Sequence, residues 1–395
     1  MELSPNVARM RPSATIAVST LAKKLAAQGR DIINLSAGEP DFDTPEHIAE
    51  AGIQGIRDGK TRYTAAAGMP ELRKAIATVC SERAGREIPW EGVVVTSGAK
   101  QALFNACFSL FGPEDEVLIG APYWTSYPEM VGLARAEAVP VLGAESRDLK
   151  VTPEDLEASA TANTRGFLFS SPGNPTGVVY SREEIQALAE WCRDRNVWLL
   201  SDEIYREICF QGDGNAPGLL DLPEESLGPH IIFDGASKCF AMTGWRMGYS
   251  VSHPATAQTM AALQSHTTSN AATPTQVAAL AAYGDWGRTM KAVAPMREAF
   301  RRRRDLVTRL FDEKLPQLPY LQPDGAFYLF FRADALFEPG RETAEAFCSW
   351  VLQEVGVALV PGEAFGEPRY VRLSYATSDE LLEEAIGRIV GLLEG

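Results

Sequence analysis

The chain lacks any cysteine pattern of the kind that binds zinc or builds a disulfide framework. Its six cysteines are scattered along 395 residues without a CxxC pair, and most of them lie in apolar stretches. Free thiols are often buried in such stretches. The pattern therefore predicts a reducing compartment, with no metal centre and no disulfide bonds.

Long apolar runs are missing as well. No uninterrupted apolar segment is long enough to cross a membrane, and the N-terminus does not have the pattern of a signal peptide. Internal repeats and low-complexity tracts are also absent. We therefore expect a soluble cytoplasmic protein without a membrane partner.

Basic charge is scarce. The 37 basic residues face 52 acidic ones, which gives a net charge of -15. This balance argues against nucleic-acid binding, which needs a basic surface. The one basic run, 301–304, has Glu298 and Asp305 beside it and is interpreted as a solvated helix face. An anionic ligand must therefore be held by locally placed donors, against the overall field.

From about residue 45, short apolar runs alternate with helical patterns. The predicted strands are 93–98, 117–119, 166–169, 197–202 and 231–233, and predicted helices include 19–28, 45–58, 71–84 and 182–193. This alternation predicts an α/β fold, a three-layer αβα unit whose mostly parallel sheet is covered on both faces. In such sheets, ligands bind beyond the carboxyl ends of the strands.

The C-terminal part predicts a second, smaller α/β unit. Its elements are a long helix at 286–313, strands at 325–331 and 370–373, and helices at 343–354 and 379–393. We expect an N-terminal arm that belongs partly to the small domain (1–40), a large domain (41–285) and a small C-terminal domain (286–395).

The segment 237–246, SKCFAMTGWR, holds one lysine and one arginine in otherwise uncharged surroundings. Apolar surroundings lower the pKa of a lysine such as Lys238 and make its amine a nucleophile, as a Schiff-base lysine requires. The planar donor fork of Arg246 suits a phosphate. Together they indicate an aldehyde cofactor that carries a phosphate, and pyridoxal 5'-phosphate fits both halves. The alternative, an exposed lysine and an ordinary ion pair, loses weight because further segments supply the remaining parts.

Those segments are VVVTSGAK (93–100), PYWTSYP (122–128), SSPGNPTG (170–177), SDEIY (201–205) and YVRLSYA (370–376). With them the chain resembles the class I aminotransferases, which are fold-type I pyridoxal-phosphate enzymes. The resemblance runs from about Ser13 to the C-terminal helix. Each motif alone is a weak signal, but their combination in this order is specific.

The first two segments correspond to the phosphate and ring sites of the family. Gly98 and Ala99 lie between a strand and a helix, where free N–H groups bind phosphate, and Lys100 follows them. On its own this would be an ordinary turn. Trp124 matches an aromatic residue that stacks on the cofactor and borders the substrate, although a lone tryptophan is more often a core residue.

The next two segments correspond to groups around the cofactor ring. By resemblance, Asn174 binds the cofactor's phenolic oxygen and the substrate carboxylate. Asp202 pairs with the pyridine nitrogen and keeps it protonated, so that the ring can act as an electron sink. Glu203 is the alternative carboxylate, one residue on and expected to point elsewhere. Tyr205 is placed to donate to the phenolic oxygen and to lower the pKa of the lysine Schiff base.

Lys238 is then the covalent attachment point and, once free, the proton shuttle at the substrate's α-carbon. Arg246 holds the phosphate. The family often has serine or threonine three residues before the lysine, where this chain has Gly235. We expect Ser237 to supply the missing hydroxyl. The sequence suggests no function for Cys239.

Three further positions complete the resemblance. Arg372 matches the arginine that holds the substrate α-carboxylate in a bidentate pair, and an arginine in apolar company needs an anion. Gly38 matches a glycine whose backbone lies against the same carboxylate. Tyr63 matches a tyrosine that reaches the phosphate in the neighbouring subunit. If this holds, each active site is shared in a homodimer.

The substrate is indicated by Lys100, Ser13 and Thr15. They resemble the aspartate/prephenate aminotransferase subgroup, where a lysine and N-terminal hydroxyls meet the distal carboxylate. A dicarboxylate needs a second cation, and a cation at a helix start otherwise opposes the helix dipole. We expect amino transfer from aspartate or glutamate to a 2-oxo acid such as 2-oxoglutarate, with prephenate as a further candidate. The alternative for Lys100 is a solvated lysine.

Three alternatives to this function stay open at this point. One is an aminotransferase for aromatic or branched-chain substrates, and another is a carbon–sulfur lyase on the same scaffold. Both would share every cofactor contact, so only Lys100 and the N-terminal arm argue against them. The third is a ligand sensor in a transcription regulator. The net charge and the short segment ahead of the arm disfavour it.

Overall fold

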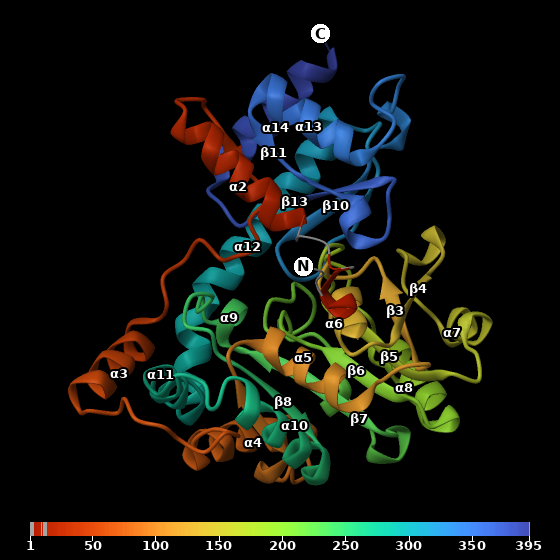
Figure 1. Cartoon of the computed structure of the whole chain (residues 1–395). Coiled ribbons are helices and arrows are strands. Elements are labelled where there is room, and N and C mark those ends of the chain that lie inside the picture. The colour runs from red at the N-terminus through yellow and green to blue at the C-terminus, as the bar shows by residue number, and fades with distance from the viewer. Residues whose placement is uncertain (1–3, 9, 11–13, 395) are drawn as a thin grey trace.

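The chain folds into a larger and a smaller unit that one long helix connects. The computed structural model describes residues 4–8, 10 and 14–394. Helix α12 (Trp286–Lys314) runs from the larger unit, at the bottom of Figure 1, into the smaller unit at the top. The exact domain boundaries after residues 40 and 285 stay a prediction. No helix in the described ranges is long and apolar enough to span a membrane.

The larger unit is built on a seven-stranded sheet with the order β2-β8-β7-β6-β5-β3-β4. Strand β8 pairs antiparallel with β7 and β2, whereas β7, β6, β5, β3 and β4 pair in parallel. The strands are β2 (Val93–Thr96), β3 (Glu116–Ala121), β4 (Glu137–Leu142), β5 (Thr164–Ser170), β6 (Trp198–Asp202), β7 (His230–Gly235) and β8 (Gly248–Ser252). The predicted α/β class with a mostly parallel sheet is confirmed.

Helices cover both faces of this sheet because its strands are apolar on both sides. In β5, Phe167 and Phe169 belong to one core cluster, and Leu168 between them belongs to the other. This is the two-residue alternation of an extended strand. One face packs against α5 (Ala99–Leu110), α6 (Tyr127–Leu133) and α10 (Pro254–Thr267), and the other against α4 (Pro70–Ala84), α8 (Arg182–Arg195) and α11 (Thr273–Gly284). Helix α3 (Glu46–Arg57) packs on α11.

Local sequence explains where several of these helices begin and end. The Ser181 side chain accepts from the Glu184 backbone N–H, and the Glu184 side chain accepts from the Ser181 N–H, so α8 starts on a capping box. Helix α4 has Pro70 at its first turn and stops at Gly85, whose φ of 63° lies in the left-handed region. These signals account for the good agreement of the predicted helix ends.

The smaller unit holds a four-stranded antiparallel sheet with the order β12-β13-β10-β9. Helices α2 (Ala14–Ala27), α13 (Ala344–Val355) and α14 (Asp379–Glu394) lie beside it (Figure 1). The N-terminal β1 (Ile33–Asn34) pairs in parallel with β11 (Val357–Ala358). The sheet strands are β9 (Tyr320–Leu321), β10 (Tyr328–Arg332), β12 (Val360–Pro361) and β13 (Tyr370–Ser374).

The predicted ends of two elements are wrong. Helix α2 begins at Ala14 rather than residue 19, because Val18 packs against the cluster of Ala22, Leu352 and Ala358 and extends the helix. The strand predicted over 325–331 begins only at Tyr328, since the second residue of that segment, Ala326, has a left-handed backbone conformation (φ 57°) that interrupts it.

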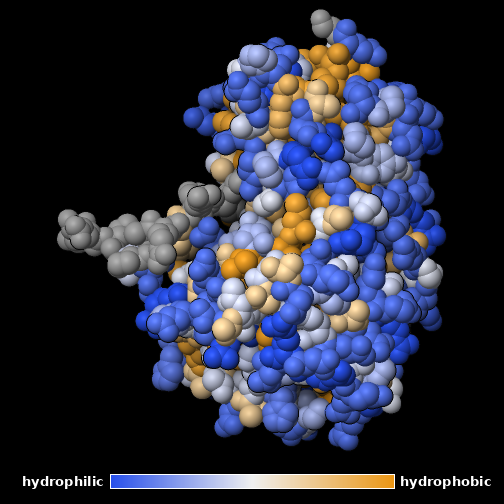
Figure 2. Space-filling view, turned by 90° about the vertical axis from the view of Figure 1, so that its right-hand side faces the viewer, coloured by the Kyte–Doolittle hydropathy of each residue, from blue (hydrophilic) through white to orange (hydrophobic). Residues whose placement is uncertain are grey.

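The interpretation of the arginine run as a solvated face is wrong for one member. Arg303 is buried, and its two terminal nitrogens each lie 2.7 Å from a carboxylate oxygen of Asp41. Arg302 forms an ion pair at the surface with Asp379, whereas Arg304, which is partly buried, forms one with Asp305. The face shown in Figure 2 is largely hydrophilic, with apolar residues in its middle and a second apolar group at the top, on the smaller unit.

Candidate active site

A cavity of about 300 Å³ lies beyond the carboxyl ends of the parallel strands, facing the sheet of the smaller unit. Most of the predicted site residues line this cavity. They are Thr15, Gly38, Ala99, Lys100, Trp124, Asn174, Asp202, Tyr205, Ser237, Lys238, Arg246 and Arg372. Gly98 and Tyr63 are not among the lining residues, and Ser13 lies outside the described residues.

Asp202, the last residue of β6, forms the anionic floor of the cavity. Its side chain is buried, and its Oδ2 accepts a 2.6 Å hydrogen bond from the Tyr127 hydroxyl. Oδ1 accepts a weaker bond from the backbone N–H of Ile204, at 3.3 Å. Burial raises the pKa of Asp202 to about 6, although the Tyr127 hydrogen bond opposes this. No cation pairs with this carboxylate within the described part of the chain.

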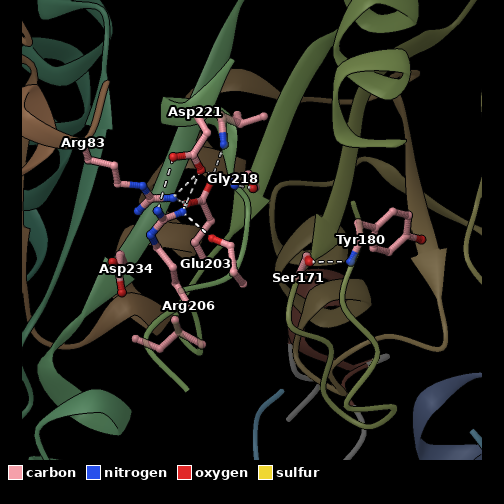
Figure 3. Close-up of polar contacts among 12 residues, drawn as sticks. Arg83, Ser171, Tyr180, Glu203, Arg206, Gly218, Asp221 and Asp234 are labelled. Atoms are coloured by element: carbon pink, nitrogen blue, oxygen red, sulfur yellow. Dashed lines mark hydrogen bonds and ion pairs between the residues drawn. The ribbon is translucent and has the colours of Figure 1, made fainter. Parts of the chain in front are cut away.

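Glu203, the neighbouring carboxylate, points the other way. Its Oε2 lies 3.0 Å from Arg83, and its Oε1 accepts from the Leu219 N–H at 2.9 Å. Arg206 and Asp221 complete this group, with an ion pair of 3.0 Å. Figure 3 shows Glu203 between the two arginines, with Asp221 alongside. We call Arg83, Glu203, Arg206 and Asp221 the arginine–carboxylate cluster.

Lys238 lies on α9 (Ala236–Cys239), the short helix directly after β7. Its Nζ donates a 2.5 Å hydrogen bond to the carbonyl oxygen of Gly38. Burial lowers the pKa of Lys238 to about 8, and the nearby charge of Glu39 opposes the shift while Arg246 adds to it. An amine with this pKa is partly neutral near pH 8, as a nucleophile requires.

The opposite end of the cavity offers donors for an anion. Arg246 donates to the carbonyl oxygens of Thr243 at 2.9 Å and Ser97 at 3.3 Å, which fixes its guanidinium over the start of α5. A Cβ on Gly98 would lie only 2.4 Å from the Arg246 Nη2. Gly98 also has φ 84°, so glycine is required here for both space and backbone conformation.

The N-terminus of α5 lies against the same place. A Cβ on Gly248 would come within 2.1 Å of the Ala99 backbone nitrogen, so strand β8 and the helix start approach as closely as two backbones can. Helix α5 is 12 residues long and directs its free N–H groups at the cavity. Ser237 is buried beside it. These groups form a phosphate-sized cradle with one cation.

Arg372, on β13, provides the second cation and is almost completely buried. Its Nη1 donates to the Asn174 Oδ1 at 2.9 Å and its Nη2 to the Ser36 carbonyl at 2.8 Å, while Nε is buried without a partner. Its guanidinium carbon lies 4.4 Å from the centre of the Tyr328 ring. Among the described residues no carboxylate pairs with Arg372, so an anion from outside is the missing partner.

Lys100 lies at the exposed rim of the cavity. Its Nζ is 4.7 Å from the centre of the Trp124 ring. Loss of hydration, and then the charge of Arg246, lower the pKa of Lys100. Thr15 of α2 lines the same cavity. A second cation and a hydroxyl therefore line the cavity in addition to Arg372.

Tyr63 lies away from the cavity, on the loop between α3 and α4. It is 89% exposed, which is unusual for an aromatic side chain of this size. Its predicted contact with the phosphate of a neighbouring subunit involves a second chain and stays a prediction.

Comparisons with known proteins agree on one family. The family model for aminotransferase class I and II matches residues 30–389. The chain belongs to this family. It is 43% identical to an aspartate aminotransferase of Streptomyces avermitilis, over 99% of this chain and 96% of that protein. It is 42% identical to an aspartate/prephenate aminotransferase of Cereibacter sphaeroides, over 100% and 99%.

A solved structure gives the same result for the fold. The aspartate aminotransferase from Thermus thermophilus with maleate superposes with a TM-score of 0.92 at 39% sequence identity, and the match covers 99% of this chain and 100% of that one. Membership of the class I and II aminotransferases implies the use of pyridoxal phosphate. The cavity fits this cofactor, because its lining includes the buried carboxylate of Asp202, the amine of Lys238 and the guanidinium of Arg246 beside the start of α5.

The aminotransferase fold also explains two oddities of the lysine segment. A Cβ on Gly235 would lie 2.6 Å from the Cα of Gly248, so no hydroxyl-bearing residue fits there. The thiol of Cys239 is buried and donates to the Gly235 carbonyl oxygen at 3.3 Å. Cys239 thus closes the short helix that carries Lys238, and its role is structural.

Sequence reasoning missed three residues of this aminotransferase site. Tyr127 holds Asp202, Tyr328 contacts Arg372, and the Ser36 carbonyl binds the same arginine. Tyr127 stands in the motif that contains Trp124, so its position was a usable signal. Tyr328 lies in an apolar run that equally suits a core strand. A backbone carbonyl leaves no signal in the side-chain pattern.

Proposed function

We propose that this chain is a pyridoxal-phosphate-dependent aminotransferase that takes the amino group of aspartate or glutamate to a 2-oxo acid such as 2-oxoglutarate. Prephenate is a further candidate acceptor. The observation that carries the proposal is the buried cation Arg372, which has no counter-ion among the described residues and lines the same cavity as Lys238. Relatives called aspartate and aspartate/prephenate aminotransferases support the substrate class.

When bound, the cofactor supplies the electron sink that lets a proton leave the substrate's α-carbon. Asp202 would keep the pyridine nitrogen protonated, because a buried carboxylate favours a cationic partner. Tyr205 would donate to the phenolic oxygen. Lys238 would take the proton from the α-carbon and return it to the cofactor's aldehyde carbon, and its lowered pKa suits it to both steps.

The anionic groups of cofactor and substrate would be held at two ends. The amides of Gly98 and Ala99, with Ser237 and Arg246, would bind the phosphate. Trp124 would cover one face of the cofactor ring. Arg372 would bind the substrate α-carboxylate as a bidentate pair, with the amide of Asn174 and the backbone of Gly38 alongside.

Substrate choice would depend on the rim. Lys100 and Thr15, with Ser13 of the N-terminal arm, would bind the distal carboxylate of a dicarboxylate substrate. Tyr63 of one subunit would complete the phosphate site of the other, so we propose a homodimer with shared active sites. The cytoplasmic location also belongs to this proposal.

The test is a half-reaction with single amino acids. The yellow protein is mixed with aspartate, glutamate, alanine or phenylalanine, without an acceptor, and the loss of visible absorbance is recorded. Rapid loss with aspartate and glutamate alone is the expected result. Loss with alanine or phenylalanine instead would retain the cofactor site and reject the dicarboxylate assignment. Protein without any bound chromophore would reject the proposed function.

A further inference from the structure

Tyr328 connects two groups of the site that belong to different units of the molecule. It is the first residue of β10, paired with Ser374 of β13, and its side chain is fully buried in the cavity wall. Its hydroxyl lies 2.8 Å from the hydroxyl of Tyr205, which follows β6 of the large sheet. The guanidinium of Arg372 lies over its ring at 4.4 Å. One side chain therefore contacts both the carboxylate-binding arginine and the tyrosine near Lys238.

The two phenols constrain each other's protons. Two hydroxyls 2.8 Å apart share one hydrogen, so only one of them donates in that contact. When the proton of Tyr205 points to a ligand oxygen, the oxygen of Tyr205 becomes the acceptor and Tyr328 the donor. Within residues 14–394, the Tyr328 hydroxyl forms its hydrogen bond with the Tyr205 hydroxyl. Once a ligand accepts a hydrogen bond from Tyr205, the hydrogen bond between the two phenols therefore runs from Tyr328 to Tyr205.

The charge of Arg372 influences this donor. Burial raises the pKa of Tyr328, and the positive charge of Arg372 opposes that shift. A phenol beside a cation is a stronger hydrogen-bond donor, because the cation stabilises negative charge on its oxygen. The hydroxyl is also held in place, since a Cβ on Gly38 would lie only 2.9 Å from it and glycine leaves just enough room.

We propose that Tyr328 is a positioning residue that passes the charge of Arg372 on to Tyr205. By donating to Tyr205, it makes Tyr205 a better donor to the phenolic oxygen of the bound cofactor. A carboxylate on Arg372 offsets the cation and weakens the whole chain of hydrogen bonds. Occupancy of the carboxylate site thereby changes the proton affinity of the cofactor site. This inference rests on the proposed function, because it needs a bound cofactor.

The test is a pH titration of the visible absorbance of the bound cofactor in wild type and Tyr328→Phe. The substitution removes the hydroxyl and retains the ring beneath Arg372. Donation by Tyr205 favours the deprotonated form of the bound cofactor, so weaker donation raises the titration midpoint. We expect Tyr328→Phe to raise the midpoint by about 0.5 to 1 pH unit, the effect of one hydrogen bond between neutral groups.

Maleate, an unreactive dicarboxylate, tests the link to Arg372. We expect saturating maleate to raise the midpoint in wild type, and to raise it by less than half as much in Tyr328→Phe. The same loss of response is expected in Tyr205→Phe, where Tyr328 is intact. In the double variant the second substitution should add nothing, since both remove the same connection.

Tyr180→Phe is the matched control. The Tyr180 hydroxyl is buried and accepts from the Val151 N–H at 2.8 Å, outside the cavity. Its removal should leave the midpoint and the maleate response unchanged. Wild-type values for both readouts in Tyr328→Phe would overturn the inference and leave the proposed function standing. A maleate response that survives in full in Tyr205→Phe would overturn it as well. A wild-type protein without a chromophore would instead reject the proposed function, and this inference with it.

Discussion

The cavity and the arginine–carboxylate cluster both contain buried charged side chains, but these have charged partners in the cluster and neutral partners in the cavity. In the cluster, arginine nitrogens lie 3.0 to 4.0 Å from carboxylate oxygens. In the cavity, Asp202, Lys238 and Arg372 form hydrogen bonds with a phenol, backbone carbonyls and an amide, all of them neutral. The two regions begin one residue apart, at Asp202 and Glu203.

This difference separates structural charge from functional charge. A buried ion pair is compensated inside the fold, whereas a buried charge with only neutral partners costs stability and favours a ligand of opposite sign. Among the described residues, no carboxylate forms an ion pair with Arg372 and no cation forms one with Asp202. These are the charges that a substrate carboxylate and a protonated pyridine would supply. The cavity is thus arranged for binding at some cost to the stability of the empty protein.

The largest effect should come from the cavity. Lys238→Ala removes the proposed nucleophile and proton shuttle, so we expect the half-reaction with aspartate to slow by about 10⁴-fold or more. The unfolding midpoint of the cofactor-free variant should equal or exceed that of wild type, because a desolvated amine is lost. Stopped-flow absorbance and urea unfolding measure the two quantities. A half-reaction within tenfold of wild type would contradict the assignment.

A substitution in the arginine–carboxylate cluster should lower the stability of the protein and leave the half-reaction rate nearly unchanged. Arg83→Met leaves Glu203 buried beside a neutral side chain, so we expect the free energy of unfolding to fall by about 3 to 5 kcal/mol. The half-reaction rate per folded, cofactor-loaded molecule should stay within threefold of wild type. Urea unfolding and rapid kinetics at low temperature check both. A selective loss of rate with unchanged stability would place the cluster in the active site.

The stability of the cofactor-free protein should depend on pH through the cavity residues. The pKa of Asp202 rises from 3.8 to about 6 in the fold, so the native state binds the extra proton and stability falls as pH rises from about 4 to 6. The pKa of Lys238 falls from 10.5 to about 8, so stability rises between about pH 8 and 10.5.

Each of these changes corresponds to about 3 kcal/mol. Urea unfolding across pH 4 to 10 measures them. The difference in stability between wild type and Asp202→Asn should show the lower window, and the difference from Lys238→Ala the upper one. Differences that do not vary with pH would mean that the two groups have ordinary pKa values in the fold.

The smallest effect concerns the rim. Lys100→Ala should lower kcat/KM for aspartate by about 10- to 100-fold, since a charged hydrogen bond is lost, and change that for alanine or phenylalanine by less than threefold. Lys74→Ala is a matched control, because Lys74 also lies over a partly buried tryptophan, at 5.2 Å from the Trp90 ring, but on α4. Equal losses with all donors would reject the distal-carboxylate role.

The comparison also shows what sequence can and cannot predict. Asp202, Lys238 and Asn174 follow strand ends, and a parallel sheet brings such positions to one edge, so they could be placed together from the sequence. The antiparallel direction of β8 leaves no signature in the five residues of that strand, GYSVS. Arg303 looked solvated because its partner, Asp41, is 262 positions away. Tyr328 resembled a core residue because its function depends on two contacts from distant segments.

The most direct test compares Asp202→Asn with Glu203→Gln in one experiment. Both substitutions exchange a buried carboxylate for an amide of the same shape, one residue apart. The free energy of unfolding of the cofactor-free variants and the half-reaction rate of the loaded variants are measured at pH 7.5. We expect Asp202→Asn to be more stable than wild type and to react at least 100-fold more slowly than wild type. Glu203→Gln should be less stable and react at nearly the wild-type rate. A stable, slow Glu203→Gln beside an active Asp202→Asn would contradict the account.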